Sequence, residues 1–395
     1  MAMTFEQARE CVIATVRAAA APATEGIAVL DAAGRVLAES IAADRDYPPF
    51  ARSARDGFAV RSADLPGELR IIGEVRAGEG FRGSLGAGET VEIMTGAPLP
   101  SGADSVVMVE HAVRNGDLVR IDHTANAGDN FNAQGLEAAG GSVVLKPGQR
   151  LGFAEIALLA MVGRERVQVY RQPRVAIVPT GDELVEAGEQ PLPFQIRNSN
   201  AWSLAVQARR AGAVPEIIGI ARDNYESTRT LIERGLQSDL LLLSGGVSAG
   251  KYDIVEKVLG DLGARFVFDR VAIQPGQPLV FGEVRGKFFF GLPGNPASTM
   301  VTFEAFARAA IELLGGAAEA RFPLTRARLT SDFRQRPGLT RFLPARLSAD
   351  GARITPEAWR GSGDVAALAR ANAFLVTDPD RESWAAGDDI RVLIK

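Results

Sequence analysis

The chain has 395 residues, which is enough for about two to four domains, and its 46% hydrophobic and 23% charged content is that of an ordinary globular protein. A net charge of -4 excludes a general nucleic-acid binder, because such a protein needs a basic surface to neutralise phosphates. The single cysteine, Cys11, excludes an internal disulfide framework, and the two histidines exclude a multi-histidine zinc site. The N-terminus has no apolar signal core, and no run approaches a membrane span. We therefore expect a cytoplasmic protein without a membrane or nucleic-acid partner.

The first part of the chain predicts two helices on either side of a β-rich region. A capping box at Thr4–Gln7 precedes an apolar stripe at helical spacing, so a helix begins there. From Gly26 to about Lys146, short β-type runs alternate with glycine and proline, which is typical of a small barrel or sandwich. A second helix is expected between Leu151 and Gly163. We expect these two helices to pack together and bracket the β-rich region.

From Arg174 to about Leu314 the pattern alternates between strand and helix, which predicts a doubly wound α/β domain with a largely parallel sheet. The remaining residues, from Pro323 to Lys395, return to short strands and turns and predict a third, β-rich domain. The expected strands are 175–179, 216–221, 239–243, 265–271 and 288–292. The expected helices are 201–211, 225–236, 254–262 and 297–314.

The stretch from Ser238 to Leu259 combines a buried strand, a glycine loop and a helix. The apolar run before Ser244 is too short for a helix and does not alternate, so it predicts a strand buried on both faces. Gly245 and Gly246 then permit backbone angles that other residues avoid, and Asp253 opens a helix. This geometry presents a helix N-terminus to an anion. The loop matches neither standard nucleotide fingerprint, so it predicts a phosphate site without naming the ligand.

Carboxylates cluster in the loops that follow the expected strands. Asp182 and Glu183 stand beside Thr180 and Gly181, while Asp223 and Asp253 follow two other strands. Ligands of doubly wound sheets bind at this edge, and carboxylates beside a phosphate need a bridging cation, so the pattern implies Mg²⁺. Taken one at a time, Asp223 and Asp253 are better explained as helix N-caps, and it is the convergence of four loops at one sheet edge that favours the functional interpretation.

Two asparagine-containing loops have both a structural and a functional interpretation. In Pro293-Gly294-Asn295-Pro296, Asn295 is a candidate cap of the following helix, and the glycine permits close approach of a ligand. The segment 198–200, Asn-Ser-Asn, also precedes a helix. We interpret it as a cap first and as a ligand contact second.

Six stretches, distributed in order along the chain, resemble those of the molybdopterin molybdenumtransferase family. This is the bacterial MoeA family, which is related to the E domain of gephyrin. The resemblance covers roughly residues 5 to 376, and the six motifs together are highly specific. They are 53-SARDGFAV-60, 93-IMTGAPLP-100, 178-VPTGDEL-184, 244-SGGVSAGKYD-253, 272-AIQPGQP-278 and 291-GLPGNPAS-298.

The resemblance implies a multidomain architecture of α/β plus β type. An elongated N-terminal domain would comprise 1–40 and 138–171, a β-rich insertion domain 41–137, the molybdopterin-binding α/β domain 172–316, and a C-terminal β-barrel 320–395. It also implies a homodimer with an inter-subunit active site, and a molybdopterin adenylyltransferase as a possible partner. The family's substrates are adenylylated molybdopterin and molybdate, its cation is Mg²⁺, and its products are molybdenum cofactor and AMP.

The resemblance also implies roles for individual residues. Asp56, Thr95, Asp182 and Glu183 would be catalytic, with Asp56 and Thr95 facing Glu183 of the other subunit. Asp223, Asp253 and Glu183 would hold the metal ion. The implied substrate-binding residues are Thr180, Gly181, Ser244, Gly245, Gly246, Ser248, Gln274, Gln277, Pro293, Gly294, Asn295 and Ser362.

The sequence departs from the family pattern at several positions. Gln274 and Gln277 stand where lysines are common, and a glutamine donates hydrogen bonds without bringing a charge. The C-terminal segment from Arg321 to Arg346 is rich in arginine, which would either compensate as a basic surface or be solvated barrel residues. The departures bear on substrate affinity and on the choice between molybdate and tungstate.

Two alternative functions are compatible with the same α/β domain. One is a non-catalytic molybdopterin-binding or scaffold protein, against which the retained carboxylates argue. The other is a molybdopterin adenylyltransferase or nucleotide pyrophosphatase, against which the β-rich insertion with DGFAV and IMTGAPLP argues, because those relatives are single-domain proteins.

Overall fold

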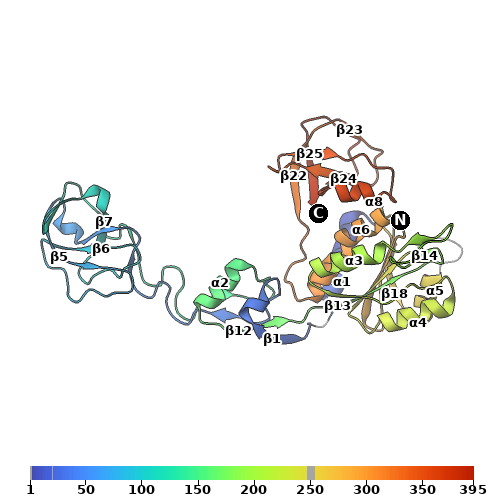
Figure 1. Cartoon of the computed structure of the whole chain (residues 1–395), viewed down its shortest axis with the longest axis horizontal. Helices are drawn as coiled ribbons and strands as arrows, with labels where there is room; N and C mark the ends of the chain where they lie inside the picture. The colour runs from blue at the N-terminus through green and yellow to red at the C-terminus, as the bar shows by residue number, and fades with distance from the viewer. Residues whose placement is uncertain (1, 20, 247–253) are drawn as a thin grey trace.

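The computed structural model describes residues 2–19, 21–246 and 254–395 of the chain. Figure 1 shows an elongated molecule in which the β-rich insertion around β5 (Gly67–Val75) forms one end. A small middle region carries α2 (Phe153–Met161), and the α/β sheet and a second β structure form the other end. No helix among the described residues is both long and apolar enough to cross a bilayer.

A mixed sheet of six strands forms the centre of the α/β region. Its order is β16-β13-β17-β21-β20-β18, and the first four strands run parallel while β20 and β18 are antiparallel to their neighbours. The five residues of β17 are all buried, as expected for a strand covered on both faces. In sheet order the strands are Val214–Ile217, Arg174–Pro179, Leu240–Ser244, Lys287–Leu292, Pro278–Val284 and Arg265–Arg270.

Helices cover both faces of this sheet, which confirms the doubly wound fold. Alternate residues of β13 and β17 point to opposite faces, so each face has its own apolar core. One core joins the sheet to α1, α3, α6 and α7, and the other joins it to α4 and α5. These helices span Phe5–Arg17, Asn200–Arg210, Pro296–Thr302, Arg308–Leu314, Tyr225–Gly235 and Ile254–Asp261.

The structure differs from the sequence expectation at the antiparallel edge. Strand β20, which the sequence analysis did not single out, forms a hairpin with β21. Both residues of its turn, Arg285 and Gly286, have positive φ values of 52° and 72°. Such a turn matches the twist of an antiparallel pair. The expected helix 297–314 is also divided, because a π-helical segment at Phe303–Ala307 separates α6 from α7.

The expected pairing of the first two helices is wrong. The apolar stripe of α1 packs on α7 and the π-helical segment, where Phe5 contacts Phe306 at a ring-centroid distance of 5.6 Å. Phe5 also contacts Phe342 of the C-terminal β structure at 5.4 Å. Helix α2 instead packs with η1 (Val29–Ala32) in a separate core of the middle region. An apolar stripe at helical spacing shows that a helix packs against something apolar, but it does not identify the partner element.

The two remaining β structures flank these regions. The insertion is a six-stranded sheet, and the C-terminal sheet closes through a β24–β26 pairing into a five-stranded barrel, as the expected C-terminal domain requires. The insertion strands, in the order β7-β4-β6-β5-β9-β8, are Ser105–Met108, Gly57–Val60, Glu89–Ile93, Gly67–Val75, Leu118–Ile121 and Val113–Asn115. The barrel strands, in the order β24-β25-β22-β28-β26, are Thr340–Leu347, Arg353–Pro356, Leu324–Leu329, Asp389–Ile394 and Ala373–Val376.

Short elements connect these regions. Strand β19 leaves the α/β region to pair in parallel with β24, so the barrel is tied directly to the sheet domain.

The numerical boundaries of the four expected domains stay a prediction. The short strands are β1 Thr24–Ala28, β2 Ile41–Ala42, β3 Arg52–Ser53, β10 Phe131–Asn132, β11 Val143–Leu145, β12 Arg166–Tyr170, β14 Leu184–Val185, β15 Ile196–Arg197, β19 Ile273–Gln274, β23 Phe333–Arg334 and β27 Ser383–Trp384, and the short barrel helix is α8 Val365–Arg370.

Candidate functional site

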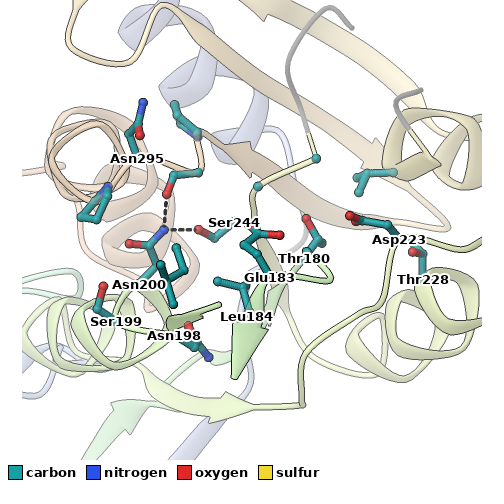
Figure 2. Close-up of a pocket in the computed structure, with 18 of the residues that line it drawn as sticks. Thr180, Glu183, Leu184, Asn198, Ser199, Asn200, Asp223, Thr228, Ser244 and Asn295 are labelled. Atoms are coloured by element: carbon teal, nitrogen blue, oxygen red, sulfur yellow. Dashed lines mark hydrogen bonds between the residues drawn. The ribbon is translucent and has the colours of Figure 1, made fainter. Parts of the chain in front are cut away.

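A cleft of about 840 Å³ lies at the carboxyl edge of the parallel strands. It is formed where the loops after β13, β17 and β21 meet the N-terminus of α3 (Figure 2). Parallel α/β sheets bind their ligands at this edge. Its lining residues include ten of the predicted ones: Thr180, Gly181, Glu183, Asp223, Ser244, Gly245, Gly246, Pro293, Gly294 and Asn295.

The glycine loop packs closely against the loop after β13. Gly245 and Gly246 have φ values of +97° and +63°, and a Cβ built on Gly245 would lie 2.8 Å from the Thr180 carbonyl oxygen. Glycine is therefore needed both for the backbone angles and for the approach. The Gly245 N–H already donates to the Leu292 carbonyl at 3.1 Å, so it is not available to a phosphate. Ser248 and Asp253, predicted to bind substrate and metal, lie outside the described residues.

Asp182 and Asp223 tie two loops of the cleft together. The Asp182 N–H donates to Asp223 Oδ2 at 3.3 Å, and the Asp223 N–H donates to Asp182 Oδ1 at 3.1 Å. The Arg222 guanidinium reinforces this junction by donating to the Asp182 carbonyl at 3.2 Å and the Leu184 carbonyl at 3.0 Å. The alternative that Asp223 caps α4 is wrong, since Asn224 accepts the capping bond from the Ser227 N–H.

The cleft offers two carboxylates, which is part of the oxygen ligand set that a hard cation such as Mg²⁺ needs. Glu183 and Asp223 both line the cleft, whereas Asp182 is not among the lining residues. Among the described residues no group of three acidic, histidine or cysteine side chains is arranged to hold a metal ion. Two carboxylates suit Mg²⁺, which binds proteins through one or two carboxylates and takes its other ligands from phosphates and water.

The segment before α3 does more than cap the helix. Asn198 Oδ1 accepts from the Ala201 N–H at 3.1 Å, which confirms the capping interpretation for that residue. Asn200 instead donates to Ser244 Oγ at 2.9 Å and to the Gly294 carbonyl at 2.7 Å (Figure 2). Asn295 occupies the N-cap position of α6 but makes no side-chain capping bond. The local sequence shows only that Asn200 lies near a helix start, so it does not predict these two contacts with distant loops.

Three buried polar atoms in the lining have no hydrogen-bond partner among the described residues. They are Thr180 Oγ1, Asn198 Nδ2 and Asn200 Oδ1. Buried polar atoms in native proteins are almost always paired, with protein or water or ligand. Other lining residues not predicted from sequence include Leu184, Ile196, Arg197, Thr228 and Pro278.

Gln274, Gln277 and Ser362 line a neighbouring cavity that shares Pro278 with the cleft. Gln274 Oε1 accepts from Arg341 Nε at 2.7 Å, and burial lowers the pKa of the Arg341 guanidinium. One barrel arginine thus contacts the residue that replaces an expected lysine.

Asp56 and Thr95 lie together, but in a different part of the molecule. The Thr95 N–H and hydroxyl both donate to Asp56 Oδ1, at 2.6 and 2.7 Å. These two bonds lower the pKa of the Asp56 carboxyl, the N–H contributing most. The residues adjoin β4 and β6 of the insertion, at the end of the molecule opposite α3 and α6 (Figure 1). Within one chain they are not brought to Glu183.

Comparisons with known proteins cover almost the whole chain. The family model for the MoeA N-terminal region (domain I and II) matches residues 3–163, that for a probable molybdopterin binding domain matches 176–313, and that for the MoeA C-terminal region (domain IV) matches 326–395. A protein of Staphylococcus epidermidis named molybdopterin molybdenumtransferase is 33% identical over 371 residues, covering 91% of this chain and 88% of the relative. A protein of the same name from Staphylococcus aureus strain MSSA476 is 33% identical, with 93% and 90% covered.

Solved structures agree with these relatives. A molybdopterin biosynthesis MoeA protein from Pyrococcus horikoshii OT3 matches with a TM-score of 0.83 and 26% identity, and all of both chains is covered. A second Pyrococcus MoeA structure matches with a TM-score of 0.75 and 32% identity over 100% of this chain and 99% of the other. The family models, the relatives and the structures agree on all regions of the fold, and the chain belongs to the MoeA family.

Proposed function

We propose that this protein inserts molybdenum from molybdate into adenylylated molybdopterin, with Mg²⁺, and releases AMP. The observation that carries the proposal is the cleft at the carboxyl edge of the sheet, which combines a glycine loop, two carboxylates and several polar side chains. Such a cleft suits a ligand that is both anionic and rich in hydrogen-bonding groups. The membership of the family supplies the substrate class.

The cleft residues divide between holding the substrate and holding the cation. Gly245 and Gly246 bring no side chain into the cleft, so a phosphate or pterin would be able to approach this loop closely. Glu183 and Asp223 would hold Mg²⁺, which when bound polarises a phosphoryl group and neutralises developing charge. Asp253 and Ser248 remain proposed contacts on the grounds of the family motif.

The neighbouring cavity is the second part of the proposed site. Gln274, Gln277 and Ser362 line it, and the Ala297 N–H donates to the Ser362 carbonyl at 2.8 Å, which joins the barrel to the start of α6. With glutamines in place of lysines, contact to an anion there relies on neutral donors and on the nearby Arg341. We keep these residues as proposed substrate contacts.

We further propose that the complete active site needs two subunits. Asp56 and Thr95 lie far from the cleft of their own chain, so a homodimer is the arrangement in which they meet Glu183. Mixing the Asp56→Ala and Glu183→Ala proteins tests this directly. Mixed dimers would contain one intact site, so random exchange should restore about a quarter of the wild-type activity; no recovery after demonstrated exchange argues for a site within one chain.

The cellular context follows from the same proposal. A chain with a single cysteine fits the reducing cytoplasm. A molybdopterin adenylyltransferase is the proposed partner, because it would produce the adenylylated substrate that this cleft consumes.

Purified protein given adenylylated molybdopterin, Mg²⁺ and either molybdate or buffer would test the function. Release of AMP that depends on molybdate is the expected result. AMP release without molybdate would instead identify a nucleotide pyrophosphatase, and no release would identify a binding or scaffold protein. The carboxylates of the cleft argue against the scaffold outcome, and the β-rich insertion argues against the pyrophosphatase.

A further inference from the structure

Asn200 connects two loops of the cleft that are far apart in sequence. Its Nδ2 donates to Ser244 Oγ, 44 residues away, and to the carbonyl oxygen of Gly294, 94 residues away. A carbonyl oxygen only accepts hydrogen bonds, so the NH₂ group must face Gly294 and the amide orientation is determined. The Asn200 Oδ1 then points away from both loops and is buried without a partner among the described residues.

The two loops lie close together where the glycine after β17 faces the glycine after β21. Ser244 ends β17 and Gly294 follows β21, the adjacent parallel strand. A Cβ built on Gly294 would lie 3.6 Å from the Gly245 Cα, an ordinary van der Waals distance, so the two loops are close neighbours. The backbone bond from the Gly245 N–H to the Leu292 carbonyl, at 3.1 Å, holds the strand ends together, but it does not by itself prevent the Gly294 loop from separating from Ser244. The two hydrogen bonds of Asn200 oppose that separation.

We propose that Asn200 is a positioning residue that sets the separation of the glycine loop and the Gly294 loop, and thereby the affinity of the cleft for the AMP portion of the substrate. The inference rests on the proposed function for the identity of that ligand. Removal of the amide deprives Ser244 Oγ and the Gly294 carbonyl of this donor. Because both loops line the cleft, small displacements of either would change the binding of a ligand there.

The helix that carries Asn200 supplies a matched control. Gln207 lies on the same helix, and its Nε2 also donates twice, to the Met300 carbonyl at 3.1 Å and to Glu304 Oε1 at 2.9 Å. Its Oε1 is likewise buried without a partner among the described residues. Gln207 is not among the residues that line the cleft. The Asn200→Ala and Gln207→Ala variants therefore lose the same kind of contact, inside and outside the site.

Two measurements on the full-length protein test the proposal. Titration calorimetry with AMP should show at least about a tenfold loss of affinity in Asn200→Ala and in the isosteric Asn200→Asp, which has no donor, and less than a twofold change in Gln207→Ala. Turnover should show a rise in KM that exceeds the fall in kcat. Amide hydrogen exchange should rise in segments 240–246 and 291–296 in the Asn200 variants alone.

Unchanged exchange in those two segments, or equal effects in the Asn200 and Gln207 variants, would overturn the positioning role. The exchange measurement needs no ligand, so it decides the role even if wild-type protein fails to bind AMP. A wild-type protein that binds AMP but shows no molybdate-dependent turnover would refute the proposed function while leaving the role of Asn200 to be decided by the exchange data.

Discussion

Replacement of Gly245 by alanine is expected to damage the cleft more than an ordinary glycine substitution. Gly245 has a φ of +97°, and the new Cβ would lie 2.8 Å from the Thr180 carbonyl oxygen and 2.9 Å from Thr180 Oγ1. Neither atom lies at the end of a flexible chain, so one of the two loops has to move. The substitution therefore combines an unfavourable backbone angle with a steric clash.

The two contributions have different magnitudes. A left-handed backbone angle costs a non-glycine residue about 1–2 kcal/mol. Overpacking against a fixed neighbour adds about 1–3 kcal/mol. The Gly245→Ala protein should therefore lose about 2–5 kcal/mol in its free energy of unfolding. Gly286→Ala isolates the first contribution, because Gly286 has a φ of +72° with nothing within 4 Å of its added Cβ.

Urea unfolding of both variants and calorimetric titration with AMP would measure these effects. Gly286→Ala should lose about 1–2 kcal/mol and keep wild-type AMP affinity, since it lies in a hairpin turn and is not among the lining residues. Gly245→Ala should lose more stability and should also lose AMP affinity. Equal stability losses in the two variants, with unchanged AMP affinity, would refute the close-approach argument.

Three further predictions concern other parts of the molecule. Glu183→Ala should lose molybdate-dependent AMP release by about 10²–10⁴-fold with unchanged circular dichroism, because its carboxylate lines the cleft; full turnover would contradict its role. Phe5→Ala should lower the free energy of unfolding, measured with urea, by about 3–5 kcal/mol, because Phe5 is buried among aromatic rings. Glu10 is exposed on the same helix, so Glu10→Ala should lower it by under about 0.5 kcal/mol. Equal losses in the two variants would contradict the packing of α1. Thr95→Ala should raise the Asp56 pKa towards its ordinary value of 3.8 in an NMR titration, since the hydroxyl that is lost stabilises the carboxylate. In the wild-type protein, the contribution of this bond to folding stability is present above pH 3.8 and disappears as the pH falls through the lower pKa of the folded state. An unchanged Asp56 titration in the variant would show that the hydroxyl bond does not form in solution.

The structure confirms those parts of the fold that local sequence patterns predict. The short apolar run Leu240–Leu243 of β17 predicts a strand buried on both faces, and the loop after a parallel strand lies at the carboxyl edge of the sheet. The location of Thr180, Glu183 and Gly245 in one cleft follows from this topology.

The parts that depend on distant contacts do not follow from local patterns. Asp223 and Asn224 both suit an N-cap, and the reciprocal bonds with Asp182 decide between them. The α1 stripe is compatible with any apolar partner, and only the assembled fold brings it to α7. Asn200 acts on residues 44 and 94 positions away, which no local signal encodes.

The central claim is that this cleft couples cleavage of the adenylylated pterin to insertion of molybdenum. The most direct test measures AMP released and molybdenum bound to pterin in the same single-turnover sample of purified protein with Mg²⁺. The account predicts equal amounts of the two products, and neither of them when molybdate is omitted. AMP released without incorporated molybdenum would contradict it.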